Sequence, residues 1–114
     1  MQLRHIALDS DWERARAEGE YRVSTVGRTI DDEGFIHASL PEQVAATAGR
    51  YYAGLGVPLV VLVMDSDRLE AAGVPVRLED AGGELFPHLY AALPVALVDD
   101  VRPAAFGHGG AFRY

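Results

Sequence analysis

One apolar segment constrains the fold of this chain more than any other part of it. Residues 59–63, Leu-Val-Val-Leu-Val, follow Pro58 and carry no polar side chain. Because side chains alternate between the two faces of a strand, both faces of this segment are apolar and must be covered. The segment therefore predicts a buried strand at the centre of a sheet.

Weaker patterns predict the elements around this strand. Alternating or short apolar runs indicate strands at residues 2–8, 34–37, 76–79, 85–90 and 95–101, with a turn at 80–84. Helices are expected at 11–18, 41–53 and 66–72, where Ser10 with Glu13 and Ser39 with Glu42 match the capping box. Strands outnumber helices, so we expect an α+β fold with a mostly antiparallel sheet and two or three short helices.

Length and composition limit the architecture and the chemistry. A chain of 114 residues suffices for one domain, which we place at 1–102, before a loosely held, glycine-rich tail at 103–114. The absence of cysteine and lysine excludes disulfides, thiolate metal sites, a cysteine nucleophile and a P-loop or Schiff-base lysine. With no signal peptide and no run of about 20 apolar residues, the chain is expected in the cytoplasm and not in a membrane.

The charge pattern argues against large polyanionic partners. The net charge is −7, and the ten basic residues, all arginines, are scattered along the sequence. Duplex nucleic acid and anionic membranes are bound by concentrated basic surfaces, so neither partner is expected. A small anionic ligand needs only one or two arginines and a helix N-terminus, and it remains compatible with the sequence.

Two short segments place polar side chains within apolar sequence. In residues 34–39, Gly-Phe-Ile-His-Ala-Ser, the strand alternation puts His37 and Ser39 on one face. In residues 86–90, Phe-Pro-His-Leu-Tyr, His88 and Tyr90 share a face beside Phe86. We therefore predict one polar site with aromatic walls, formed by both segments.

The individual candidates also have structural explanations. His5, on an apolar face of the first strand, suits either the same pocket or the core. Ser39 is explained by helix capping, and it lacks the Gly-x-Ser-x-Gly turn of a hydrolase nucleophile. Glu79 is either the exposed half of an alternating strand or a general base. The spacing of the histidines matches no metal-site pattern, so we expect no metal.

Several stretches together resemble the uncharacterised bacterial family DUF952. They are Gly-Phe-Ile-His-x-Ser at 34–39 followed by Gln43, the apolar strand at 59–65, and Phe-Pro-His-Leu-Tyr at 86–90. The resemblance extends over about residues 2–101. It implies an ADP-ribosyltransferase-like fold, in which a small split antiparallel sheet holds NAD in a cleft, and it makes Gln43 and Phe86 ligand-binding candidates.

The resemblance implies a nucleotide-like ligand, with NAD as the candidate cofactor. ADP-ribosyltransferase-like enzymes use a first-strand histidine or arginine, an aromatic wall and a glutamate that orients a ribose. By position, His5 is similar to the first-strand histidine, Tyr90 or Tyr21 to the aromatic wall, and Glu79 to the glutamate. His37 is a further catalytic candidate. Two hypotheses remain open, an NAD-using transferase or nucleotide hydrolase and a non-catalytic nucleotide-binding module.

Overall fold

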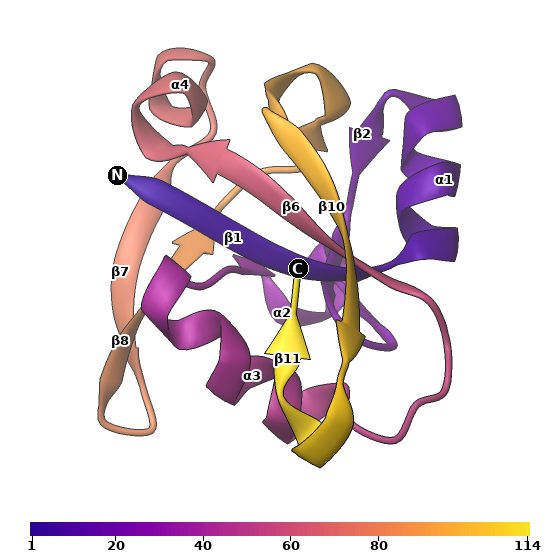
Figure 1. Cartoon of the computed structure of the whole chain (residues 1–114). Coiled ribbons are helices and arrows are strands. Elements are labelled where there is room, and N and C mark those ends of the chain that lie inside the picture. Colours follow the sequence, from indigo (N-terminus) through magenta and orange to yellow (C-terminus); the bar gives the residue numbers. More distant parts are fainter.

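The computed structural model describes residues 1–114 and has a four-stranded antiparallel sheet at its centre (Figure 1). The strands, in spatial order, are β1 (Gln2–Leu8), β6 (Leu59–Asp65), β10 (Asp100–Phe106) and β11 (Phe112–Arg113). β6 pairs with β1 on one side and with β10 on the other. Every residue of β6 except Asp65 is buried, which confirms the prediction of a central strand at 59–63.

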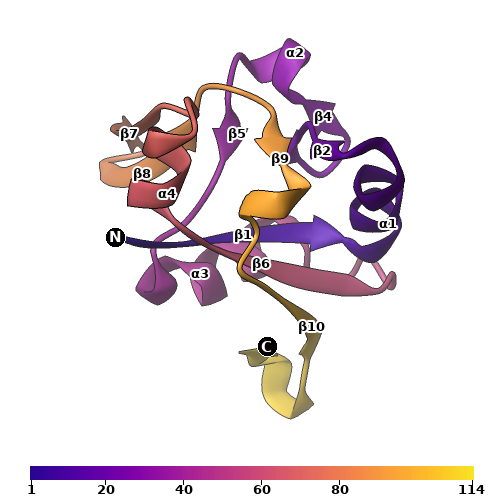
Figure 2. The same cartoon turned by 90° about the horizontal axis from the view of Figure 1, so that it is seen from above.

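Alternation along β6 explains why both of its faces are apolar. Val60, Leu62 and Met64 belong to one buried cluster, whereas Leu59 and Val61 belong to a second. The first cluster includes the inner face of α1 (Asp9–Glu18), and the second includes that of α3 (Val44–Tyr51). Figure 2 shows the two helices on opposite sides of the β1–β6 pair. The sheet is therefore covered on both faces, as the sequence of β6 requires.

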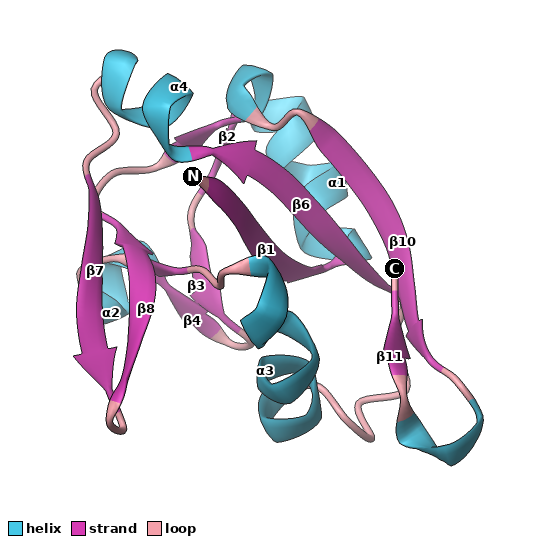
Figure 3. Cartoon of the chain, turned by 60° about the vertical axis from the view of Figure 1, so that its left-hand side comes forward, coloured by secondary structure: helices cyan, strands magenta, loops and turns pink.

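A second antiparallel sheet carries half of the candidate site residues, namely His37, Glu79, Phe86 and His88. It consists of β5 (Ile36–His37), β8 (Glu84–Leu89) and β7 (Val76–Ala81), in that spatial order. A single β-bridge, between Arg4 and Ser39, connects β1 to the segment after β5. Two short ladders join β2 (Glu20–Tyr21) to β9 (Leu93–Pro94) and β3 (Val23–Thr25) to β4 (Arg28–Thr29). Figure 3 shows the β7–β8 hairpin on one side of the molecule and the β10–β11 hairpin on the other.

Helical segments connect the strands. Besides α1 and α3 they are α2 (Ile30–Glu33), α4 (Ser66–Ala71) and three 3-10 turns at Pro41–Gln43, Val95–Leu97 and His108–Gly110. α2 falls in a region whose sequence predicted no element. With it, the α-helices outnumber the two or three that were expected. The α+β class with antiparallel sheets is confirmed. None of the helices combines the length and the apolar character that crossing a membrane requires.

Neither predicted capping box forms. α1 begins two residues earlier than the Ser10 box requires, with Leu8 at the N-cap position and no side chain capping the helix. At the second site the backbone N–H of Leu40 donates to Oε1 of Gln43 at 2.9 Å, so Ser39 is not the cap. A capping side chain works only when its own backbone is still extended, and a shift of one residue removes it from that role.

The C-terminal part of the chain is more ordered than its composition indicated. The strand predicted at 95–101 is wrong at both ends, because Val95–Leu97 form a 3-10 turn and β10 extends from Asp100 to Phe106. The expected boundary between domain and loose tail, at 102/103, therefore lies inside β10, where Pro103 and Ala104 pair with β6. Phe112 packs against the cluster on the α3 side of the sheet. These contacts are distant in sequence, so local composition does not reveal them.

Candidate functional site

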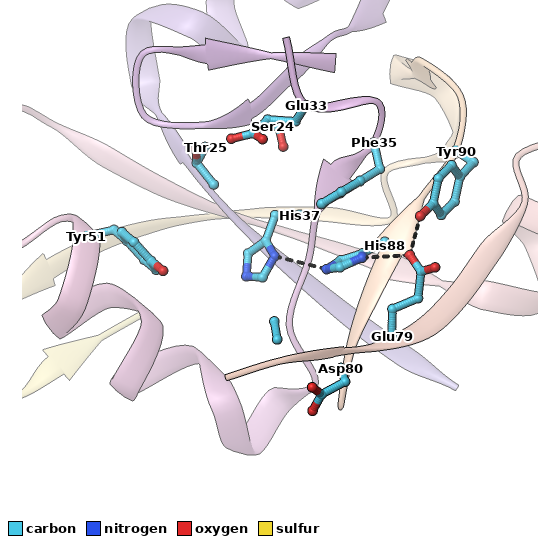
Figure 4. Close-up of a pocket in the computed structure, with 11 residues that line it drawn as sticks. Ser24, Thr25, Glu33, Phe35, His37, Tyr51, Glu79, Asp80, His88 and Tyr90 are labelled. Atoms are coloured by element: carbon cyan, nitrogen blue, oxygen red, sulfur yellow. Dashed lines mark hydrogen bonds and ion pairs between the residues drawn. The ribbon is translucent and has the colours of Figure 1, made fainter. Parts of the chain in front are cut away.

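The largest cavity of the molecule opens beside the second sheet (Figure 4), and we call it the cleft. Its volume of about 490 Å³ lies within the range of small-molecule sites. The lining residues are Ser24, Thr25, Glu33, Phe35, His37, Tyr51, Glu79, Asp80, Ala81, His88 and Tyr90. Most of them belong to β3, α2, β5, α3, β7 and β8, whereas Phe35 and Tyr90 lie just outside β5 and β8, so the cleft depends on the tertiary arrangement of most of the chain.

A hydrogen-bonded series of side chains, which we call the polar chain, crosses the wall of the cleft (Figure 4). The Tyr90 hydroxyl donates to Oε1 of Glu79, and Nδ1 of His88 lies 2.9 Å from the same oxygen. Nε2 of His88 lies 3.3 Å from Nδ1 of His37. β8 lies between β5 and β7, and the pairing register places His88 directly opposite His37. Sheet pairing thus joins four polar residues from three separate segments.

Aromatic rings surround the polar chain. Phe35 stacks on the His88 ring, with the centroids 3.9 Å apart and the planes 13° from parallel. Phe35 also lies 5.8 Å from the Tyr90 ring, and the Arg77 guanidinium lies 4.9 Å from the centroid of Tyr90. Tyr51, across the cleft in Figure 4, makes no aromatic contact with another ring and is 46% exposed. One wall of the cleft is therefore formed by rings that pack against one another, and the Tyr51 ring opposite it contacts no other ring.

The protonation states of the polar chain follow from its surroundings. Burial, and secondarily the nearby His88 ring, lowers the pKa of His37 from 6.5 to about 4. Hydrogen bonds from Tyr90 and then from His88 lower the pKa of Glu79, and the same bond raises the pKa of Tyr90. At neutral pH, His37 is therefore an uncharged imidazole, Glu79 is a carboxylate and Tyr90 keeps its proton.

His5 does not line the cleft. It is 2% exposed, with Nδ1 2.6 Å from the backbone oxygen of His37 and Nε2 2.9 Å from the Tyr21 hydroxyl. Burial lowers the pKa of His5 to about 4, so the ring is neutral, with Nδ1–H donating and Nε2 accepting. Both ring nitrogens are occupied by the protein. His5 therefore anchors the strand that carries His37.

The other three predicted ligand contacts also lie outside the cleft. The Ser39 hydroxyl is buried and donates to Oγ1 of Thr47 at 3.4 Å. Gln43 donates through Nε2 to Glu84 and to the Leu85 backbone oxygen, both at 2.8 Å. Gln43 and Phe86 line a neighbouring depression of about 300 Å³, which we call the side hollow. His37 is shared by the cleft, the side hollow and a small inner cavity of about 10 Å³ beside His5 and Ser39.

The sequence patterns missed several residues of the cleft. Ser24 is 1% exposed, and its hydroxyl has no hydrogen-bond partner although it lines both the cleft and the inner cavity. No sequence signal marks it, because the region before Gly34 lacks a period. Phe35 was predictable, since it is two residues from His37 and alternation puts both on one face. Tyr51, at the end of α3, was assigned to the helix and not to the site.

The cleft offers an aromatic surface, an unpaired hydroxyl, a neutral imidazole and carboxylates. No group of three or more His, Cys, Asp or Glu side chains is placed to hold a metal ion. The polar side chains that line it can form hydrogen bonds, carry charge and transfer protons.

Comparison with known proteins assigns the chain to a family. A family model described as a protein of unknown function, DUF952, matches residues 6–101. The chain belongs to the DUF952 family. Both motif segments, 34–39 and 86–90, lie within the matched region, so the resemblance seen in the sequence is confirmed. No curated protein matches the chain.

Solved structures of a related protein have the same fold. The crystal structure of protein CC0527 from Caulobacter crescentus is similar with a TM-score of 0.83 and 30% sequence identity, over 99% of this chain and 94% of that chain. The solution NMR structure of CC0527 is similar with a TM-score of 0.77 and 29% identity, over 96% and 90% of the two chains. The two proteins therefore share one fold over nearly the full length of both chains.

Proposed function

We propose that this DUF952 protein binds a small nucleotide-like ligand, with the heterocyclic ring and its sugar in the cleft. The unpaired hydroxyl of Ser24 in an aromatic-walled cavity of about 490 Å³ carries this proposal. A buried hydroxyl without a partner costs free energy, on the order of 1–3 kcal/mol, and a bound ligand with a polar group can recover it. The free Tyr51 ring supplies a surface on which a heterocycle can stack.

Charge determines which part of a nucleotide suits the cleft. Glu33, Glu79 and Asp80 line it, and no arginine does. Arg50 lines the adjoining side hollow and forms no ion pair within the protein. The base and ribose therefore match the cleft, while a phosphate matches Arg50 beyond Tyr51, which borders both spaces. For NAD this arrangement suits the nicotinamide riboside half and offers a single cation to the diphosphate.

The helix N-terminus before α3 offers little to a phosphate. The 3-10 turn Pro41–Gln43 precedes α3, and the N–H of Leu40 is bonded to the Gln43 side chain. An anion at this position has to compete with that intramolecular bond. Arg50 is for this reason the better candidate for the phosphate.

Binding without turnover is the favoured form of the proposal. A base with a pKa of about 4, as His37 has, accepts protons weakly at neutral pH, whereas efficient general bases have pKa values near the working pH. Oε1 of Glu79 already accepts two hydrogen bonds, from Tyr90 and His88. Catalysis of the ADP-ribosyltransferase type is the second candidate, and it requires Glu79 to reach the ribose through its other oxygen.

Titration with a panel of ligands tests the binding proposal. NMR chemical-shift perturbation with adenosine, nicotinamide riboside, AMP, ADP-ribose and NAD should give saturable shifts centred on the cleft residues. Tyr51→Ala should weaken binding at least about fivefold, since stacking on one aromatic ring contributes roughly 1–3 kcal/mol. Tyr114→Ala removes a tyrosine of similar exposure, 38%, outside the cleft, and should leave the affinity unchanged. No saturable shift with any probe at millimolar concentration would refute the proposal.

A separate assay tests the catalytic candidate. The release of nicotinamide from NAD is measured for the natural protein and for Glu79→Gln. Under the transferase hypothesis the substitution should abolish turnover and spare binding, because the amide cannot replace the charge that the ribose step needs. Binding of NAD without release of nicotinamide by the natural protein would leave the binding module as the function.

A further inference from the structure

The hydrogen-bonding capacity of Glu79 sets the direction of the polar chain. An ionised carboxylate only accepts hydrogen bonds, so both Nδ1 of His88 and the Tyr90 hydroxyl must donate to it. When His88 carries a single ring hydrogen, this bond places it on Nδ1 and leaves the lone pair on Nε2, the atom that lies 3.3 Å from Nδ1 of His37. His37 must then donate through Nδ1. Its own lone pair is left on Nε2.

Nε2 of His37 is the free end of the polar chain. It makes no hydrogen bond within the protein, and it is accessible to solvent. The His37 ring borders the cleft, the side hollow and the inner cavity, so a molecule in any of these spaces can meet it. The bond from Nδ1 of His5 to the His37 backbone oxygen, at 2.6 Å, holds the residue in place from the other side. The site thus presents a lone pair of fixed direction.

We propose that His37 is a fixed hydrogen-bond acceptor that determines specificity, so that the cleft selects heterocycles with an N–H donor, such as a carboxamide or ring amino group, over carboxylates. This inference rests on the proposed function, which it deepens by naming the chemistry of the ligand. His37 contacts the ligand, whereas Glu79 and His88 are positioning residues that act through it. The lowered pKa of His37 keeps the acceptor in its neutral form down to mildly acidic pH.

Electrostatics favours the same ligands. The cleft has carboxylates and no arginine, so an anionic ligand group meets repulsion as well as the lone pair of His37. An acceptor that a bound ligand covers without donating to it loses its hydrogen bond to water, which is why sites built around polar groups discriminate strongly against analogues that lack the partner. A donor-bearing ligand satisfies His37 and avoids both penalties.

The tautomer of His37 tests the inference on the free protein, with no ligand needed. Long-range proton–nitrogen NMR of the full chain labelled with ¹⁵N-histidine distinguishes protonated from bare ring nitrogens. His37 should carry its hydrogen on Nδ1. His5, whose Nδ1 faces a carbonyl oxygen, should show the same tautomer and serves as the internal reference. A protonated His88 would donate to His37 and put the His37 hydrogen on Nε2, so finding that tautomer overturns the inference.

A pair of variants tests whether the carboxylate sets the tautomer. Glu79→Ala removes the acceptor that orients His88, and His37 should then show a mixture of both tautomers. Asp80→Ala removes the neighbouring carboxylate, which bonds to neither histidine, and should leave the tautomer of His37 unchanged. The amide spectrum of each variant reports whether the fold is intact. An unchanged tautomer in folded Glu79→Ala contradicts the positioning role.

Matched ligands test the selectivity. Nicotinamide and nicotinate share one ring and differ in whether the substituent donates or carries a negative charge, and adenosine and purine riboside differ only in the amino group. Nicotinamide and adenosine should each bind at least tenfold more tightly than their partners, and His37→Phe should reduce both ratios. Equal or tighter binding of nicotinate overturns the inference even if the panel of nucleotides binds. If no probe binds at all, the proposed ligand class and its selectivity both fail, while the tautomer measurement still decides the direction of the polar chain.

Discussion

His5 makes the stability of the fold sensitive to mild acid. In the folded protein burial lowers its pKa to about 4, whereas in the unfolded chain the value is about 6.5. Between these values the unfolded chain binds a proton that the folded protein does not, so the free energy of unfolding falls as the pH falls. The contribution is fully present above about pH 6.5 and is lost progressively as the pH decreases through 4.

The two pKa values give the size of the effect. One pKa unit corresponds to about 1.4 kcal/mol, so protonating His5 in full costs about 3 kcal/mol, of which about 2 kcal/mol has been lost at pH 5. With a urea dependence of about 1–3 kcal/mol per molar for a small domain, the midpoint should fall by roughly 1 M from this residue alone. His37 acts in the same direction, but it is partly exposed and contributes less.

Urea unfolding at pH 7 and pH 5 isolates the contribution of His5. His5→Gln cannot titrate in this range, so it should be less stable than the natural protein at pH 7 and lose about 2 kcal/mol less between the two pH values. His108 lies exposed on the surface, and His108→Gln should leave the pH dependence unchanged. The interval stops at pH 5 because carboxylates with lowered pKa values, such as Asp65 and Asp100, lose their contributions at lower pH. An identical loss in His5→Gln and the natural protein would show that His5 is not buried as a neutral ring.

Further predictions concern the support of the site. Tyr21→Phe leaves Nε2 of His5 buried without a donor and should lower the free energy of unfolding by about 1–3 kcal/mol, whereas Tyr114→Phe at the surface should change it by less than about 0.5 kcal/mol in thermal or urea unfolding. Gly34→Ala should destabilise the protein by about 1 kcal/mol because the residue has a φ of +87° and nothing crowds its Cβ position. Gly49→Ala, in α3 with an open Cβ position and no positive φ, should instead stabilise it by about 0.5–1 kcal/mol. The same sign for both glycine variants would contradict the backbone argument.

Local patterns predicted those elements whose burial follows from their own amino acids. The segment 59–63 became the central strand because an apolar strand has to be covered on both faces. The pattern of residues 2–8 was equally decisive, since β1 matches it from Gln2 to Leu8. The region 95–106 was harder, because its strand is defined by pairing with β6 and not by its own alternation.

The candidate site was predictable only in part. Alternation identified His37, His88 and Tyr90, and all three line the cleft with Glu79. His5 and Ser39 carry the same kinds of polar group, yet their partners are Tyr21 and Thr47 inside the protein. Whether a polar side chain faces a cavity or a buried partner depends on what the rest of the fold places opposite it.

The sequence by itself determined the α+β class, the central strand, the family and the polar residues that meet near His37. Each of these follows from local properties, namely alternation, apolar runs and motifs. The tertiary structure alone decided that His88 lies between Glu79 and His37, and that Ser24 faces the same cleft without a partner. The physical reason is that hydrogen bonds between side chains require positions within about 3 Å, and only the pairing of distant strands brings these residues that close.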